Sequence, residues 1–377
     1  MQKSMKGIEK EVRTRKIKRY VTLICIVACI MVVVLVMLNS RRNIKIAERQ
    51  AEDTQAITIT ARAKNNNNYT EVTSEDNIAV PVPKGYVASP NVEERYVNGV
   101  TTNGVREHHG GFVIYEKNAG ETDEQATEVI AANLNTAKTS RNQYVWVPIS
   151  NSEVSNMSNT SYEPTLVLNY DKDNTYLKSY MEGISGNEFL QRMRKDFIEM
   201  LESVKSYEGF YIGRYETGNI SSKVPVVRKQ NNNISNVNWY QMYKACKNLK
   251  AGNNSVQTGI IWETQFKKTL NWLINSGEKT NSQINDATSW GNYYNSSGGG
   301  SLRPTGSNES WKANNIYDLA GNAFDWTMGG NSAFRRELGG CYSQYVVGNA
   351  NPVNFTNGYY PTESRKTLCC RAMLYIL

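Results

Sequence analysis

Histidine and cysteine, the residues that most often carry nucleophilic or metal chemistry, are few in this chain of 377 residues. The two histidines, His108 and His109, are adjacent, and the sequence has no G-x-S-x-G turn, which nearly excludes a Ser/His/Asp triad. The phosphate-binding G-x-x-x-x-G-K-[ST] and G-x-G-x-x-G patterns are absent as well. Outside an apolar N-terminal run, the cysteines lack both C-x-x-C and metal-ligand spacing, and they are Cys246, Cys341, Cys369 and Cys370.

These cysteines have two possible uses. In an oxidising compartment, Cys341 could form a disulfide with Cys369 or Cys370. Adjacent residues of a strand point to opposite faces, so at most one of that pair would suit the partner. The alternative is that all four are buried free thiols. The sequence leaves both possibilities open.

A different kind of site is indicated at residues 341–366, which read CYSQYVVGNANPVNFTNGYYPTESRK. Tyrosine supplies rigid contact area at a low cost in conformational entropy, and the many Asn, Ser, Thr and Gly residues supply adaptable hydrogen bonds. The alternative is an irregular loop in which Tyr342 and Phe355 are packed rather than exposed. We predict a binding surface with contacts from Tyr342, Ser343, Tyr345, Asn354, Asn357 and Tyr359.

The N-terminal part of the chain predicts a membrane anchor. Residues 21–38 form an unbroken run of 18 apolar or near-apolar residues, and a helix of that length spans roughly 27 Å, enough to cross a bilayer core. Residues 1–20 are strongly basic, whereas charges after the run nearly balance, which predicts a cytoplasmic tail, a single pass and an extracytoplasmic body. A cleaved signal peptide or a lipoprotein is the alternative, and the poor cleavage site at Val36–Ser40 and the apolar residues past Cys29 argue against them.

The net charge of +8 is confined to this flank. Residues 1–42 hold ten basic and two acidic side chains, which leaves the remainder of the chain neutral. A neutral body gives no electrostatic case for binding nucleic acid. Residues 39–76 are polar and asparagine-rich without apolar periodicity, so we expect a stalk or linker before a domain at 77–377.

The elements that would position the predicted surface are helices and short strands, so the expected fold class is α+β. Apolar residues fall on one helical face in three segments, at 187–205, 239–249 and 262–273, and residues 123–138 could form a further helix. Residues 282–310 should be long and irregular. Short β-type runs lie at 80–86, 111–115, 144–148 and 209–216.

Three motifs near the C-terminus carry a family resemblance. Asn315 to Thr327 reads NIYDLAGNAFDWT, Leu338-Gly339-Gly340 follows, and the chain ends on RAMLYIL. With the run GFYIGRYE at 209–216, this order resembles the formylglycine-generating-enzyme (sulfatase-modifying-factor) family, a branch of the C-type-lectin-like fold. The resemblance covers residues 205–377 best. It implies short strands, two or three helices and much irregular chain.

The resemblance does not extend to the catalytic residues of that family. Its oxidative enzymes bind copper through two cysteines after the G-G turn, and the aligned positions here hold Gln344 and Asn349. An amide cannot replace a thiolate ligand of a soft metal. A second branch uses histidine-ligated iron, but His108 and His109 lie outside the conserved region. We therefore expect no copper and assign no catalytic residue, with an oxidase acting on a protein cysteine as the alternative.

The resemblance also implies a calcium site. In the family, the asparagine and the acidic residue of G-N-x-x-[DE]-W contribute to a bound calcium, and Asn322 and Asp325 occupy those positions. Calcium prefers carboxylate, amide and backbone carbonyl oxygens. Asp325 replaces the commoner glutamate, which shortens the reach by one methylene. The alternative is a turn in which both side chains bind backbone donors.

Residues 341–366 correspond in this resemblance to the region varied in the C-type-lectin-like variable proteins of diversity-generating retroelements. Those proteins share a G-G-x-Y opening, an N-P-x-x-[YF] centre, a Y-P turn and a final R-x-x-L-Y-I, all present here. Most of the segment fits the products of adenine-directed mutagenesis of asparagine codons, although Gln344 and Lys366 do not. The sequence favours a membrane-anchored, non-catalytic display protein that binds a protein or surface ligand. A structural cell-envelope or prophage component is a further alternative.

Overall fold

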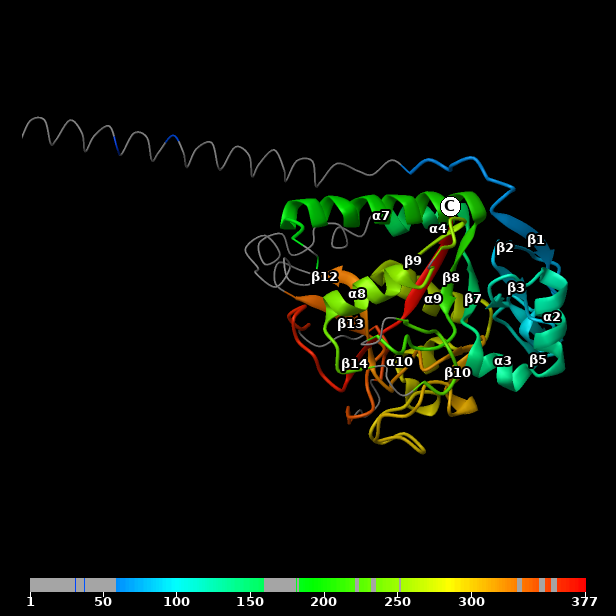
Figure 1. Cartoon of the computed structure of the whole chain (residues 1–377). Helices are drawn as coiled ribbons and strands as arrows, with labels where there is room; N and C mark the ends of the chain where they lie inside the picture. Colours follow the sequence, from blue (N-terminus) through cyan, green and yellow to red (C-terminus); the bar gives the residue numbers. More distant parts are fainter. Residues whose placement is uncertain are drawn as a thin grey trace, which may run out of the picture. The chain divides into compact units, whose positions relative to one another are not determined.

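Figure 1 shows the chain as a computed structural model. It describes residues 59–158, 181–220 except 182, 224–231, 235–250, 252–330, 334–345, 350–353 and 358–377, together with Met31 and Met37. The chain divides into two units, Met1–Gln55 and Ala56–Leu377, and every helix and strand given below belongs to the second.

No helix within the described ranges is long and apolar enough to cross a membrane. The predicted cytoplasmic tail and anchor, at 1–20 and 21–38, lie outside the described residues apart from Met31 and Met37.

The bounds of the elements are as follows. The helices are α2 (Asp123–Ala132), α3 (Leu134–Ser140), α4 (Asn151–Ser158), α7 (Gly186–Tyr207), α8 (Trp239–Asn248), α9 (Glu263–Asn275) and α10 (Asn281–Asn285), with 3-10 turns η1 (Val92–Glu94), η2 (Ala287–Ser289) and η3 (Glu309–Trp311). The strands are β1 (Tyr69–Thr73), β2 (Ala79–Pro83), β3 (Tyr86–Ala88), β4 (Gly99–Thr102), β5 (Val105–His109), β6 (Val113–Glu116), β7 (Gln143–Pro148), β8 (Gly209–Gly213), β9 (Val256–Ile260), β10 (Lys312–Ala313), β11 (Ile316–Tyr317), β12 (Phe324–Gly330), β13 (Arg335–Leu338), β14 (Leu368–Cys370) and β15 (Ala372–Ile376).

Within the described residues, the largest sheet has six antiparallel strands in the order β3-β6-β7-β8-β15-β9. The C-terminal strand β15, red in Figure 1, lies between β8 and β9, and all five of its residues are buried. A second sheet has the order β13-β12-β14, with β12 and β14 parallel. The architecture is mixed α+β, as predicted.

Helix α7 confirms the strongest helical pattern in the sequence. The Ser185 side chain accepts a hydrogen bond from the Glu188 N–H and caps the first turn. The helix ends at Glu208, whose φ of 60° is left-handed, just before Gly209 opens β8. It packs on β8 and β15. Its buried face is built from Phe189, Leu190, Met193, Phe197, Met200, Leu201 and Val204, each of which contributes roughly 1.5–3 kcal/mol by burial.

Two expectations change on inspection of the fold. Residues 123–138 form two helices rather than one, because Asn133 leaves the helical conformation (φ −150°) and its side chain caps α3. The predicted stalk at 39–76 is too long at its C-terminal end. Tyr69–Thr73 is strand β1, paired with β2, and the Asn68 side chain donates to the Leu377 carbonyl over 2.5 Å. The Asn68–Leu377 contact joins residues 309 apart, and no residue of β1 is fully buried, so the polar composition of the segment did not reveal either feature.

Candidate recognition site

The core of the site is a rigid turn that follows β13. Gly339 and Gly340 both have positive φ, 92° and 85°, a region that glycine adopts without strain. A Cβ on Gly340 would lie 2.6 Å from Cε1 of Tyr293, so glycine is also required by contact. The Tyr293 hydroxyl donates to the Gly339 carbonyl over 2.8 Å, and the Tyr342 N–H donates to the Asn322 carbonyl over 3.0 Å. The turn is therefore held against the motif at 315–327.

Gln344 closes this turn. Its side-chain oxygen accepts from the Cys341 N–H over 3.0 Å, and its own N–H donates to the Cys341 carbonyl over 3.1 Å. Cys341 is buried, its sulfur lies 3.3 Å from the Ser343 hydroxyl, and burial raises the pKa of its thiol. The position aligned with a copper-binding cysteine thus holds an amide that shapes the backbone.

The turn presents three of the predicted contact residues together. Ser343 and Tyr345 are exposed, Tyr345 by 69%, while Tyr342 is half-buried. Sequence reasoning missed a fourth residue, Tyr294, which is 60% exposed and whose ring centre lies 6.0 Å from that of Tyr345. The Tyr294 N–H donates to the Gln344 carbonyl over 3.0 Å, which joins the two loops. Tyr294 lies in the stretch predicted to be irregular, and no periodic signal points to it.

The other three predicted contacts are placed differently or lie outside the described residues. Tyr359 is half-buried, with its ring 6.2 Å from that of Trp326 and the Arg365 guanidinium 4.4 Å from its centre. It packs beside β12 and β13 rather than standing free. Asn354 and Asn357 lie outside the described residues, so their predicted role stays a prediction.

Asn322, one of the two predicted calcium ligands, is fully buried at a left-handed φ of 61°. Its amide oxygen accepts from the Asn292 side chain over 2.9 Å and from the Arg303 N–H over 3.0 Å. Its amide nitrogen donates to the Glu216 carboxylate over 2.6 Å. The side chain therefore ties three chain segments together.

Asp325, the other predicted ligand, belongs to a buried acidic cluster with one cation. Its carboxylate accepts from Nε of Arg371 over 3.0 Å. Burial raises the pKa of Asp325, against the opposing Arg371 charge. Burial raises the pKa of Asp318 to about 6, and it raises that of Glu216 well above its usual value, with Asp318 and Asp325 adding to the effect.

These contacts bear on the calcium prediction. The Asn322 amide oxygen and one Asp325 carboxylate oxygen already accept protein donors, and a cation beside Asp325 would face the Arg371 guanidinium. No group of three or more His, Cys, Asp or Glu side chains within the described ranges is arranged to hold a metal ion. Of these donors only the Arg303 N–H is a backbone group, and the calcium site stays a prediction.

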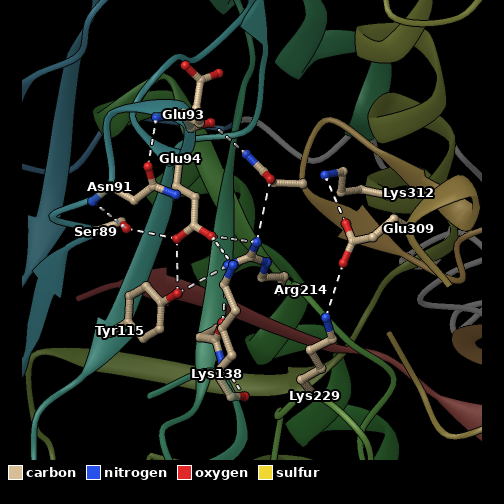
Figure 2. A network of polar contacts seen from close by, with 12 residues as sticks. Ser89, Asn91, Glu93, Glu94, Tyr115, Lys138, Arg214, Lys229, Glu309 and Lys312 are labelled. Atoms are coloured by element: carbon tan, nitrogen blue, oxygen red, sulfur yellow. Dashed lines mark hydrogen bonds and ion pairs between the residues drawn. The ribbon is translucent and has the colours of Figure 1, made fainter. Parts of the chain in front are cut away.

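A second buried network, shown in Figure 2, fixes the start of this motif to the rest of the domain. Glu94 accepts from Arg214 over 2.8 Å, and Lys138 Nζ lies 2.9 Å from the same oxygen. Its other oxygen accepts from Ser89 over 2.8 Å and from Tyr115 over 2.9 Å. Burial opposes ionisation, but the Arg214 and Lys138 charges outweigh it and lower the pKa of Glu94 to about 2.

The motif joins this network through Asn315. Its side chain donates to the carbonyls of Gly110 and Gly111 over 3.1 and 2.9 Å, and its oxygen lies 3.5 Å from the Arg214 guanidinium. Gly111 has a φ of 95°, and a Cβ there would lie 1.8 Å from the Asn314 carbonyl oxygen. The glycine pair after the histidines is thus explained by close backbone approach.

The two histidines lie on β5, and each contacts a residue from another part of the chain. The His108 ring stacks on Tyr96 with centres 4.5 Å apart, and Nδ1 of His109 lies 2.8 Å from the Glu278 carboxylate. Asn349, the other position aligned with a copper-binding cysteine, lies outside the described residues.

No protein-family model matches the chain, and no curated protein matches it. Among solved structures, it is similar to Treponema denticola variable protein 1, with a TM-score of 0.32 and 14% identity over 44% of this chain and 84% of that chain. It is also similar to PvdO from Pseudomonas aeruginosa, with a TM-score of 0.31 and 12% identity over 45% of this chain and 81% of that chain. The first of these is a variable protein, one of the kinds of protein to which the sequence resemblance pointed.

Proposed function

We propose that this chain is a membrane-anchored recognition protein of the formylglycine-generating-enzyme type. It displays a ligand-binding surface, built on the turn at 339–345, outside the cell membrane. The observation that carries the proposal is the exposed pair of Tyr345, on a turn whose backbone is fixed by Gly340 and Gln344, and Tyr294, on the neighbouring loop. Large exposed aromatic side chains on a rigid frame bind with little loss of conformational entropy.

The contact chemistry favours a polar, largely rigid partner surface such as a folded protein. Tyr345 and Tyr294 offer flat rings with hydroxyl tips, and Ser343 lies exposed beside them. Such a patch combines apolar area with hydrogen bonding, as recognition loops do. Residues 43–377 carry no net charge, so we propose no nucleic-acid partner.

The test is a binding screen with the full chain in detergent micelles. The labelled protein is applied to an array of purified bacterial surface proteins and glycans, as wild type, Tyr345→Ala and Tyr294→Ala. The control is Val105→Ala, because Val105 is 65% exposed on β5, outside the proposed surface. We expect each tyrosine variant to weaken binding to a protein by roughly tenfold or more, and the control to leave it unchanged.

Three outcomes would contradict the proposal. The wild type could bind no member of the array, or its binding could be insensitive to both tyrosine substitutions. The third is formylglycine formation on a Cys-x-Pro-x-Arg peptide, which would support the oxidase alternative. Membrane placement has its own test, since protease added to intact cells should cleave the domain at 77–377 and spare the residues before the anchor.

A further inference from the structure

Two buried cysteines from distant parts of the chain face each other in the core. Cys246 lies on α8 and Cys370 ends β14, 124 residues later, and their sulfur atoms are 3.5 Å apart. Both side chains are fully buried. A disulfide bond needs the sulfurs about 2.05 Å apart, so a shift of roughly 1.5 Å in two side chains would complete it.

The other two cysteines outside the N-terminal run do not compete for this partner. Cys369 points to the opposite face of β14, where its sulfur lies 3.3 Å from the Asp325 carboxylate. Cys341 lies in the turn at 339–345 with its sulfur beside Ser343. Strand alternation therefore selects one member of the adjacent pair, and its partner is one that the sequence did not suggest.

The location of Cys370 connects this pair to the display surface. The segment 341–366 leaves the second sheet after β13 and returns to it at β14, where Cys370 pairs in register with Trp326 of β12. A bond from Cys370 to α8 would fix the returning end of that segment to a helix packed on β9 of the large sheet.

We propose that Cys246 and Cys370 form a disulfide that fixes the C-terminal end of the segment 341–366. The inference rests on the extracytoplasmic placement proposed above and not on the identity of the ligand. Two thiols lose two protons and two electrons to the disulfide of a thiol oxidoreductase, which is reduced to its dithiol. A thiolate attacks that disulfide, and the second cysteine then displaces the reduced partner from the mixed disulfide.

The timing of this step follows from burial. Burial raises the pKa of the Cys370 thiol well above its usual value, so the folded domain holds little reactive thiolate there. The bond must therefore form while the chain folds, before α8 covers the strand. A fully folded, reduced domain is expected to oxidise slowly.

The experiment tests separately whether the two cysteines can form the bond and whether they form it in the cell. The purified full chain is denatured, refolded in a mixture of reduced and oxidised glutathione, alkylated without reduction and digested for mass spectrometry. We expect a cross-linked peptide pair containing Cys246 and Cys370, which Cys369→Ser and Cys341→Ser retain and Cys246→Ser abolishes. The same alkylation on protein taken directly from cells reports whether the bond forms in place.

Stability gives a second readout. Reductant should lower the Tm of the oxidised wild type by about 5–10 °C and leave that of Cys246→Ser unchanged. A cross-link to Cys341 or Cys369, or complete alkylation of Cys246 and Cys370 after glutathione refolding, would overturn the proposal. If the bond forms on refolding but is absent from cells, the extracytoplasmic placement fails, and the bond as a native feature fails with it, while the recognition surface is untouched.

Discussion

Replacing Glu94 by glutamine tests the buried network that joins the motif at 315–327 to the large sheet (Figure 2). Glu94 is 2% exposed and faces two cations, Arg214 at 2.8 Å and Lys138 at 2.9 Å. Glutamine keeps the size and an acceptor oxygen but removes the charge. Arg214, only 1% exposed, then faces a neutral amide. Breaking a buried ion pair on one side costs about 3–5 kcal/mol.

The pKa of Glu94 gives an independent magnitude. It falls from 4.5 to about 2, because the Arg214 and Lys138 charges outweigh the burial that opposes ionisation. A shift of that size corresponds to about 3 kcal/mol of folding free energy at pH 7. Since the folded-state pKa is lowered, this stability is present above pH 4.5 and is lost as the pH falls through about 2.

The assay is urea unfolding of the full chain in detergent at pH 7 and pH 3. We expect Glu94→Gln to lose about 3 kcal/mol at pH 7 and about 1 kcal/mol near pH 3, because the wild type has by then lost most of its advantage. Glu93→Gln is the control, since that neighbouring side chain is 58% exposed. A loss below about 1 kcal/mol at pH 7, or an equal loss at both pH values, would refute the reasoning.

Four further predictions concern the motif and the turn. Asp318→Asn should flatten the fall in Tm that the wild type shows as pH rises from 4 to 7, because burial raises the pKa of Asp318 to about 6 and ionisation then costs about 3 kcal/mol; an unchanged pH profile would contradict this. Gly340→Ala should lose roughly 1–3 kcal/mol more in urea unfolding than Gly104→Ala, because both have positive φ but only Gly340 would clash with a neighbouring ring; equal losses would count against it. Gln344→Ala should lose about 1 kcal/mol and speed proteolysis of the turn, because its side chain holds a backbone N–H. Calcium at millimolar concentration should raise the Tm if Asn322 and Asp325 bind it as predicted, whereas an unchanged Tm would favour the turn held by protein donors, among them the Arg371 guanidinium that faces Asp325.

Local signals in the sequence predicted helices α7, α8 and α9 but not α4 or α10. The apolar stripes of α7, α8 and α9 depend on residues three or four apart. Such patterns can be read directly from the chain. Strand β1 was missed because its residues are mostly polar and none is fully buried, and the hairpin of β4 with β5 was missed although its Asn103-Gly104 turn is a typical local hairpin signal.

The candidate site was predictable only in part, because some of its neighbouring residues are far apart in the sequence. Composition singled out Tyr342, Ser343 and Tyr345, which the turn brings together. It could not find Tyr294, whose partner lies 51 residues along the chain, or the Cys246–Cys370 contact across 124 residues. Nothing in the residue types specifies such distant neighbours, and only the folded chain supplies them.

In the turn, the groups that fix the backbone differ from the side chains that are exposed, and this arrangement favours the proposed display function over a catalytic one. Its shape depends on backbone groups of Cys341 and Tyr342, on two glycines and on the side chains of Gln344 and Tyr293. Gln344, like Lys366, does not fit the products of asparagine-codon mutagenesis. The exposed side chains of Ser343 and Tyr345 contact the Cys341 sulfur and the Tyr294 ring rather than the backbone of the turn, so their exchange is expected to leave the frame in place. A catalytic site requires fixed side chains at its reacting centre. A recognition surface requires only that the frame stay constant while its exposed residues change.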